Sequence, residues 1–568
     1  MTASTATGPD TTELADNAAP LDALLVDAAL GPARRFLPDA STAAWALSLA
    51  RRPRTTARRL GGLVGEASKI AVGTSDVAPR RGDRRFSDEG WTENPLLRRL
   101  VQLYLAGGHT AEQLIEDAEL DPRDRKRVRF LVENITEAVA PSNVPLVNPA
   151  SAKAVIDTAG LSLARGAGHL AKDLLSAPRV PEMVDTSGFA IGENIAATPG
   201  AVVFRNEMLE LIQYAPQTDE VYTTPVLVVP PTINKFYALD LAPDRSLVEH
   251  MVREGHQMFV ISWRNPDARH ASWGIETYVQ AILEGLDTVE EITGSTQTVL
   301  SGICSGGILA SIVAAYLAGI GRQDRIAAFV LAVTVIDNAD AGTVSALTDP
   351  NLAAIAKARS ARKGYLDGRA LAEVFAWLRP SDLVWNYWVN NYLLGKRPPA
   401  FDILFWNADS TRMPATLHAD FVDLAIENQL TKPGALTVLG VPIDLGAVSV
   451  DNYIVAGIAD HITPWENCYR TTQLLGGTSR FILSTSGHIA ALVNPPTNRK
   501  ASFHTNDDHG ADPKAWLRDA QTHEGTWWAD VAIWLDGRSG ERKPAPKELG
   551  STRLRPLVEA PGTYVFDK

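Results

Sequence analysis

A cysteine flanked by glycines is the first candidate for chemistry in this chain. Cys304 lies two residues after Gly302 and two before Gly306, and apolar stretches precede it (298–301) and follow it (307–317). These stretches predict a buried strand and a helix, joined by a sharp turn that exposes the nucleophile. Such a turn requires glycines on both sides of the nucleophile, because it leaves no room there for a Cβ. A thiolate here attacks thioesters and forms a thioester itself, so the pattern predicts acyl transfer. The alternative is a buried, inert cysteine, the more common fate of a lone cysteine.

His488 is the predicted base. Where a nucleophile stands on such a turn, the acid and then the base follow it along the chain, each after a strand of the same sheet. The apolar stretch 480–484 predicts the last such strand, and His488 follows it closely. The other histidines after Cys304 do not have this position; they are His418, His461, His504, His509 and His523.

Asp460 is the predicted acid. It follows the carboxyl end of the stretch 453–456, which predicts the preceding strand, whereas Asp451 lies at the opposite end of that strand. The neighbouring His461 has two interpretations, a contact with substrate or a hydrogen bond to the loop backbone.

An oxyanion hole needs two aligned backbone donors. One is expected to be the amide of Ser305, directly after the nucleophile. The other is expected in the loop 230–235, which follows an early strand. The sequence does not distinguish the amides of this loop, and we take Ile233 as the candidate.

A sheet whose strands alternate with helices must position these residues. From residue 202 onward, short apolar stretches alternate with helical patterns such as 246–254 and 275–292. This alternation predicts a parallel sheet covered on both faces. Together with the nucleophile turn it predicts an α/β protein with the α/β-hydrolase fold. The predicted strands are 226–229, 258–262, 298–301, 327–335, 453–456 and 480–484.

Two parts of the chain depart from this alternation. Residues 338–437 lack a clean strand pattern and are rich in aromatic residues. They predict a cap over the active site, whose aromatics mostly form its own core while a few line an apolar channel. Residues 83–200 predict a mostly helical N-terminal domain, and residues 1–82 a disordered, basic extension. The catalytic domain is then 201–568.

The composition is that of a globular protein. Lys and Arg number 54 and Asp and Glu 66, a formal charge of −12, which disfavours nucleic acid as a partner. Cys304 and Cys468 provide neither a disulfide framework nor a zinc cluster, which fits a reducing cytoplasm, and Cys468 is expected to be structural. The first residues lack a secretory-signal pattern, and the longest apolar run, 308–320, is too short to span a membrane.

The motifs together resemble those of the polyhydroxyalkanoate synthases, which polymerise 3-hydroxyacyl-CoA into storage polyester. The stretch 302–307, with its cysteine, is similar to the lipase-like box of that family. The resemblance runs from about residue 83 to the end of the sequence. Further similar stretches are 83–86, 141–143, 148–149, 230–241, 262–266, 378–387, 404–409, 460–465, 486–488 and 561–565.

This resemblance implies a cytoplasmic acyltransferase of the single-subunit type, working as a homodimer and associated with polyester granules. It implies no metal and no cofactor, because the coenzyme A thioester is the substrate. Cys304 would hold the growing chain as a thioester, His488 would deprotonate the thiol, and Asp460 would assist attack by the 3-hydroxyl group. Arg379 and His461 lie in segments that the resemblance places near coenzyme A.

Two other functions remain open from the sequence. A thioesterase or depolymerase would use the same triad but let water accept the acyl group; a capped, aromatic site excludes water and favours the polymerase. A non-catalytic granule-coat protein is the second alternative, and the intact set Cys304, Asp460 and His488 argues against it. The helical domain is expected to support polymerisation and granule attachment, because every triad candidate lies after residue 300.

Overall fold

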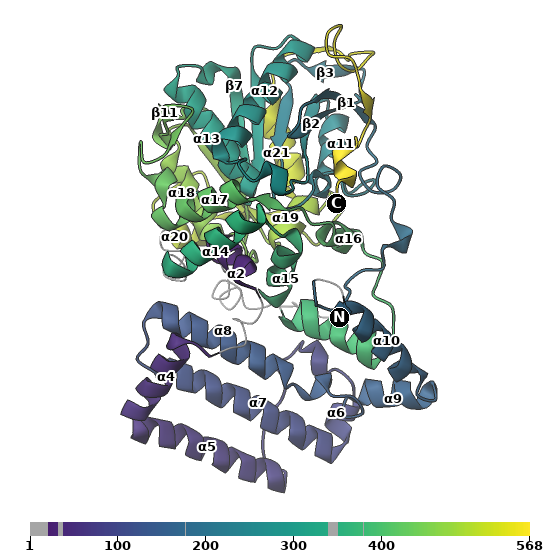
Figure 1. Ribbon diagram of the computed structural model, residues 1–568, viewed down its shortest axis with the longest axis vertical. Coiled ribbons are helices and arrows are strands. Elements are labelled where there is room, and N and C mark those ends of the chain that lie inside the picture. The colour runs from purple at the N-terminus through teal and green to yellow at the C-terminus, as the bar shows by residue number, and fades with distance from the viewer. Residues whose placement is uncertain (1–20, 32–37, 176–177, 339–349, 379) are drawn as a thin grey trace. The chain divides into compact units, whose positions relative to one another are not determined.

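A computed structural model of the chain describes residues 21–31, 38–175, 178–338, 350–378 and 380–568 (Figure 1). They form two compact units. The first, which we call the sheet unit, contains residues up to Ala29, Thr186–Gly368 and Asp402–Lys568. The second, the helical unit, contains Leu30–Asp185 and Arg369–Phe401.

The sheet unit is built on one large mixed sheet (Figure 1). In spatial order, the strands that the described residues contribute are β15 (Gln521–Glu524), β14 (Ser502–Thr505), β13 (Ser479–Ser484), β12 (Asn452–Gly457), β7 (Ile326–Ala332), β6 (Thr298–Ile303), β4 (Val226–Val229), β5 (Met258–Trp263), β2 (Leu209–Tyr214), β1 (Gly200–Arg205) and β17 (Val558–Glu559). The strands from β13 to β5 run parallel. The remaining strands pair antiparallel at the two edges.

The six strands predicted from the sequence are all present in the parallel centre, with ends shifted by at most three residues. The predicted parallel sheet forms the centre, and strands that were not predicted from the sequence pair antiparallel at both edges. At one edge, β1 and β2 form a hairpin whose turn is held by Asn206, whose side chain accepts hydrogen bonds from the amides of Met208 and Leu209 at 2.8 Å. At the other edge β15 is mostly exposed and polar, so it lacks the apolar pattern by which buried strands are recognised.

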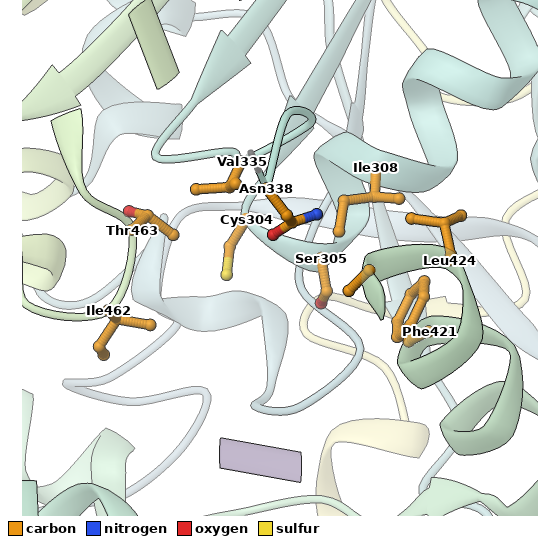
Figure 2. A pocket seen from close by; sticks show the side chains of 10 residues that line it. Cys304, Ser305, Ile308, Val335, Asn338, Phe421, Leu424, Ile462 and Thr463 are labelled. Atoms are coloured by element: carbon orange, nitrogen blue, oxygen red, sulfur yellow. The ribbon is translucent and has the colours of Figure 1, made fainter. Parts of the chain in front are cut away.

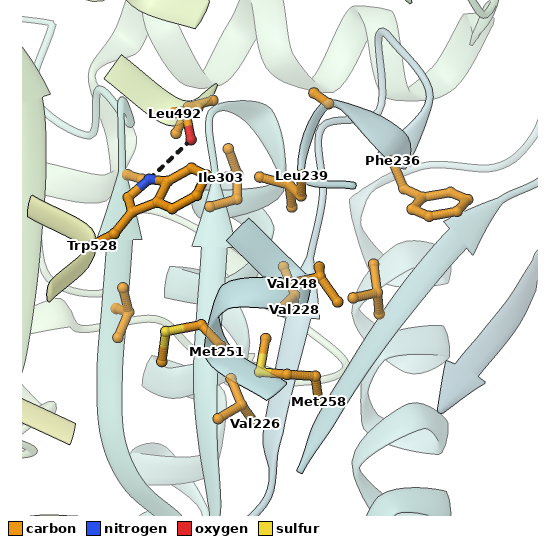
Figure 3. Close-up of a cluster of buried hydrophobic side chains, with 14 of the residues drawn as sticks. Val226, Val228, Phe236, Leu239, Val248, Met251, Met258, Ile303, Leu492 and Trp528 are labelled. Carbon is orange, nitrogen blue, oxygen red and sulfur yellow. Dashed lines mark hydrogen bonds between the residues drawn. The ribbon is translucent and has the colours of Figure 1, made fainter. Parts of the chain in front are cut away.

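The parallel strands are buried because helices cover both faces of the sheet. On one face, Met251 and Trp528 pack against strand residues that include Val226, Val228 and Ile303 (Figure 3). The opposite face packs against helices that include the one carrying Gly285, where an added Cβ would lie within 4 Å of side chains on β4 and β5. Strand residues facing either way are therefore apolar, which explains the continuous hydrophobic runs in the sequence.

Apart from α2 (Leu21–Leu30), which precedes all the strands, the helices of the sheet unit lie between the strands and in the inserted segment. These others are α11 (Leu247–Arg253), α12 (Ile275–Thr293), α13 (Ser305–Gly319), α14 (Pro350–Lys363), α16 (Asp402–Ala408), α17 (Ala415–Glu427), α18 (Trp465–Leu474), α19 (His488–Val493), α20 (Pro513–Arg518) and α21 (Trp527–Asp536). Short two-stranded sheets pair β3 (Glu220–Tyr222) with β16 (Arg542–Pro544), β8 (Tyr365–Leu366) with β9 (Met413–Pro414), and β10 (Thr437–Val438) with β11 (Val441–Pro442).

The helical unit corrects the expectation of a disordered extension over residues 1–82. Helices α4 and α5 of this unit lie within that stretch, as does α2 of the sheet unit; residues 1–20 are outside the described residues. The side chain of Asp39 caps the start of α4 and pairs with Arg127 at 2.8 Å. The helices of this unit are α4 (Ala40–Arg51), α5 (Pro53–Val72), α6 (Gly90–Glu93), α7 (Pro95–Glu116), α8 (Pro122–Ala138), α9 (Pro149–Asp157), α10 (Leu161–Leu175) and α15 (Gly368–Leu378).

The predicted cap, 338–437, is divided between the two units. Residues 369–401 belong to the helical unit, where π-helical turns at Ser381–Trp385 and Trp388–Leu393 follow α15. Three of the aromatics expected in the cap, Trp377, Trp385 and Trp388, pack edge to face there. The ring centroids are 6.1 Å apart in the first pair and 5.7 Å apart in the second. These aromatics therefore build a core of the helical unit. Of the described helices, none is long and apolar enough to span a membrane.

Candidate active site

Cys304 lies at the turn between β6 and α13. Its backbone has φ 50° and ψ −123°, a conformation that costs energy in an L-residue and must be enforced by the surroundings. A Cβ on Gly306 would lie 2.3 Å from the carbonyl oxygen of Pro230, and one on Gly302 would lie 2.6 Å from Cα of Gly307. The glycines therefore permit the close packing that holds the thiol at the carboxyl edge of the sheet.

Asp460 and His488 meet at the same edge. Asp460 follows β12 and His488 begins α19 after β13, and these strands are parallel neighbours. Nδ1 of His488 lies 2.7 Å from Oδ2 of Asp460. Both side chains are withdrawn from solvent, with exposed fractions of 8% and 0%.

Every side of the Asp460 carboxylate is occupied. Oδ1 accepts hydrogen bonds from the amides of Ile462 at 2.8 Å and Thr463 at 2.9 Å, and Oδ2 accepts from the Thr463 hydroxyl as well as from His488. Burial by itself raises the pKa of Asp460, but the charge of His488 and these hydrogen bonds outweigh burial and lower it. Asp460 is thus held as a carboxylate whose acceptors face His488 and its own loop.

His488 connects the carboxylate to the thiol. Burial by itself lowers the pKa of His488, but the charge and hydrogen bond of Asp460, joined by a hydrogen bond with Cys304, raise it above its ordinary value. With Nδ1 directed at Asp460, the ring is oriented to take a proton from the thiol. The structure therefore brings together Cys304, Asp460 and His488, which lie far apart in the sequence.

The thiol faces a pocket whose walls are mostly apolar (Figure 2). Ile308 lines it from α13, and Phe421 and Leu424 line it from α17, which belongs to the part of the predicted cap in the sheet unit. Asn338 contributes a polar side chain close to Cys304 in this view. The pocket thus offers an apolar wall for an acyl group beside a buried nucleophile.

The loop 230–235 is fastened to the first turn of α13. The fully buried hydroxyl of Ser305 accepts a hydrogen bond from the amide of Thr232 at 2.9 Å, and the two hydroxyl oxygens are 3.1 Å apart. The amide of Thr232 is therefore engaged. The amide of the buried Ile233 donates to no group in the described part of the chain. A buried amide without a partner is unusual, and an oxyanion would supply one.

The remaining sequence candidates are less informative. Arg379 lies outside the described residues, and His461 is partly exposed in the loop after Asp460. Sequence reasoning missed Thr463, which binds both Asp460 and His488, and Asn338; the only signal for Thr463 is its position just after the predicted acid. Among the described residues, no group of three His, Cys, Asp or Glu side chains is arranged to hold a metal ion.

Family models match both parts of the chain. Residues 82–251 match the model described as the N-terminus of poly-beta-hydroxybutyrate polymerase (PhaC), and residues 225–495 match the alpha/beta hydrolase fold. The second match agrees with the sheet and the nucleophile turn described above. The protein therefore has the predicted α/β-hydrolase fold.

Curated relatives extend this likeness over nearly the whole chain. Poly(3-hydroxyalkanoate) polymerase 2 of Ectopseudomonas oleovorans is 46% identical over 518 residues, which cover 91% of this chain and 92% of the relative. The poly(3-hydroxyalkanoate) polymerase subunit PhaC of Cupriavidus necator is 39% identical over 506 residues, covering 88% of this chain and 85% of the relative. Identity at this level and coverage confirms the resemblance found in the sequence: the chain belongs to the polyhydroxyalkanoate polymerase family.

Proposed function

We propose that this protein is an acyltransferase that polymerises 3-hydroxyacyl groups from coenzyme A thioesters and holds the growing polyester on Cys304. The observation that carries the proposal is a thiol beside the hydrogen-bonded Asp460–His488 pair, at the wall of an apolar pocket. Membership of the polymerase family supports the same reaction. Coenzyme A enters as part of the substrate, and no further cofactor takes part.

The first half-reaction acylates the enzyme. His488 takes the proton of Cys304, and the thiolate attacks the thioester carbonyl. The amides of Ser305 and Ile233 stabilise the oxyanion that forms. When the carbonyl re-forms, the bond to coenzyme A breaks and the departing thiolate takes the proton from His488.

The second half-reaction makes the ester bond. His488 takes the proton of the 3-hydroxyl of an incoming hydroxyacyl-CoA as its oxygen attacks the thioester on Cys304. The bond to sulfur breaks, Cys304 recovers the proton, and the chain now ends on coenzyme A, one unit longer. Cys304 then attacks this new thioester, releases coenzyme A, and the cycle repeats with balanced protons.

The surroundings of Asp460 support an indirect part for it in this cycle. Its oxygens already accept four donors, and its side chain is fully enclosed. A substrate hydroxyl would have to displace one of these partners to reach the carboxylate. We therefore propose that Asp460 assists attack by the 3-hydroxyl only through His488, by holding the ring and stabilising its charged form.

A thioesterase would use the same residues with water as the acceptor, and butyryl-CoA separates the two reactions. This substrate acylates Cys304 but carries no 3-hydroxyl to continue the chain. We expect one equivalent of coenzyme A per active site followed by arrest, with butyryl-enzyme visible by intact-protein mass. The matched control is 3-hydroxybutyryl-CoA, which should give continuous release and polymer. Continuous release from butyryl-CoA with free butyrate would establish the thioesterase instead.

We further propose that the helical unit attaches the enzyme to polyester granules. Large apolar side chains are exposed on its helices, among them Val64 of α5, Leu96 of α7 and Leu175 of α10, each more than two-thirds exposed. Burying such side chains against polyester contributes about 1.5–3 kcal/mol each. Replacing Leu60 and Val64, one turn apart on α5, by Glu should lower binding to polyester particles at least about tenfold, measured by sedimentation.

The control for this variant lies in the sheet unit. Leu439→Glu changes an exposed apolar residue there and should leave particle binding unchanged. The initial rate of coenzyme A release should be the same in both variants, because neither position lies at the Cys304 pocket. Unchanged binding of the α5 variant would assign granule attachment to another surface.

A further inference from the structure

The loop 230–235 carries the candidate oxyanion amide and is held on more than one side. Ser305 holds it at Thr232, as described above. Thr411 holds it at Ile233, whose carbonyl oxygen accepts the Thr411 amide at 3.0 Å. At the far end, the indole N–H of Trp406 donates to the carbonyl oxygen of Lys235 at 2.7 Å. Lys235 thus fixes the end of the loop two residues after the Ile233 amide.

Lys235 is fixed by the last residues of the sequence. Its side chain is 4% exposed, and its ammonium donates to the carbonyl oxygens of Val565 and Asp567, the latter at 2.9 Å. Asp409 completes the surroundings as an ion-pair partner at 3.3 Å. Burial lowers the pKa of Lys235, and the negative charge of Asp409 offsets part of this effect by raising it. A buried ammonium of this kind is stable only while its partners stay in place.

The segment 561–568, which we call the tail, is itself anchored to the sheet. Glu210 of β2, a buried residue, accepts hydrogen bonds from the amides of Thr563 at 2.8 Å and Tyr564 at 2.9 Å. The guanidinium of Arg264, just after β5, lies 4.2 Å from the centre of the Tyr564 ring. These contacts place the tail carbonyls at a defined position relative to the sheet edge that carries Cys304.

We propose that Lys235 is a positioning residue for catalysis, which transmits the fixed position of the tail to the oxyanion amide of Ile233. The inference rests on the proposed function, because it assumes that an oxyanion forms at Cys304. Lys235 lies two residues after Ile233, so a shift of its backbone moves the amide away from the oxyanion. Loss of one oxyanion donor slows the reaction by about 10²–10³-fold. A donor that is displaced but still present should slow the reaction by a smaller factor. The loop meets the nucleophile turn at Ser305 and not at the Cys304 thiol or the His488 ring, so thiolate formation should be unaffected.

Lys235→Met tests this because it keeps the length of the buried chain and removes the donors. Two rates are measured at Cys304: single-turnover acylation by 3-hydroxybutyryl-CoA, and alkylation by iodoacetamide, followed on the peptide that contains Cys304. Alkylation needs the thiolate but no oxyanion hole. We expect acylation to slow at least about tenfold while alkylation stays within twofold of the unchanged protein.

Two further variants keep the test decisive if Lys235→Met folds poorly. Asp409→Asn weakens the ion pair without emptying the site and should slow acylation to a smaller extent. Truncation after Ala560 removes the tail and should slow acylation as Lys235→Met does, with no additional loss when the two changes are combined. Arg480→Met, which breaks the ion pair with Asp530 at 2.6 Å, is the control for general destabilisation and should change neither rate.

The outcomes separate the inference from the function on which it rests. If the unchanged protein is not acylated at Cys304, the proposed function fails. If it is acylated and Lys235→Met is acylated at the same rate, or if acylation and alkylation fall together, Lys235 does not position the oxyanion amide.

Discussion

Replacing Cys304 by alanine is expected to stop coenzyme A release and polymer formation, with a loss of at least ~10⁴-fold. The reason is chemical: Cys304 is the one thiol among the described residues that line the pocket, and the Thr463 hydroxyl, which also contacts His488, is engaged with Asp460 and far harder to deprotonate. Coenzyme A release from 3-hydroxybutyryl-CoA, measured with a thiol reagent, checks the rate. Intact-protein mass checks for the acyl-enzyme.

Two other cysteine variants make this prediction specific. Cys304→Ser should keep only a small fraction of the activity, because an alcohol is far harder to deprotonate than a thiol beside the same base. Cys468→Ala should keep the activity within about threefold. It should lower stability slightly, because Cys468 is fully buried in α18. Near-normal turnover in Cys304→Ala would refute the assignment of the nucleophile.

Asp460→Asn is expected to separate the two half-reactions. A thiol, with an ordinary pKa of ~8.5, needs little help from an oriented base, whereas a secondary alcohol needs much more. Without the carboxylate, His488 loses the partner that holds its ring and stabilises its charge. We expect a burst of coenzyme A close to one equivalent per active site, followed by elongation slowed by ~10³–10⁴-fold.

The burst and the steady state are both measured by rapid-quench coenzyme A release. Thr463→Val is the matched control, because it removes the hydroxyl that donates to the carboxylate and contacts Nδ1 of His488 but leaves the Asp460–His488 contact; it should slow elongation far less. Equal reduction of burst and steady-state rates in Asp460→Asn would show that Asp460 serves both half-reactions alike.

The placement of Cys304, Asp460 and His488 at one edge of the sheet was predictable because local signals determine it. Asp460 and His488 each follow an apolar strand, and the carboxyl ends of parallel strands meet at one edge of the sheet. Burial on both faces makes those strands apolar throughout, so their ends are visible in the sequence. The 2.7 Å contact between the two side chains follows from this geometry.

Features that depend on distant contacts were not predictable in the same way. Residues 369–401 follow a helical pattern that suits a cap, yet they pack with the helical unit through contacts such as that of Tyr392 with Asp173 at 2.7 Å. The buried bond between Ser305 and Thr232 joins positions whose residue types are common in loops. The contact of Lys235 with the tail is of the same kind, because it links segments more than 300 residues apart.

The extension at residues 1–82 shows a different limit. Its first residues, rich in Thr, Ala and Asp, and its arginine clusters suggested disorder, but α4 packs Trp45 and Leu49 against a buried cluster that includes Ile115 and Val128. Asp39 caps it and pairs with Arg127, and the indole of Trp45 donates to the carbonyl oxygen of Leu114 at 3.3 Å. Such contacts between individual residues cannot be read from the average composition of the segment.

The measurement that tests the central claim most directly is the mass of the Cys304 peptide during turnover. The enzyme is mixed with 3-hydroxybutyryl-CoA, quenched in acid after times shorter than and comparable to one turnover, digested and analysed by mass spectrometry. A growing polyester on Cys304 predicts a ladder of masses on that one peptide, spaced by a single hydroxybutyryl unit and lengthening with time. A single acyl group that never lengthens while free hydroxybutyrate accumulates, or a ladder on a peptide without Cys304, would contradict the account.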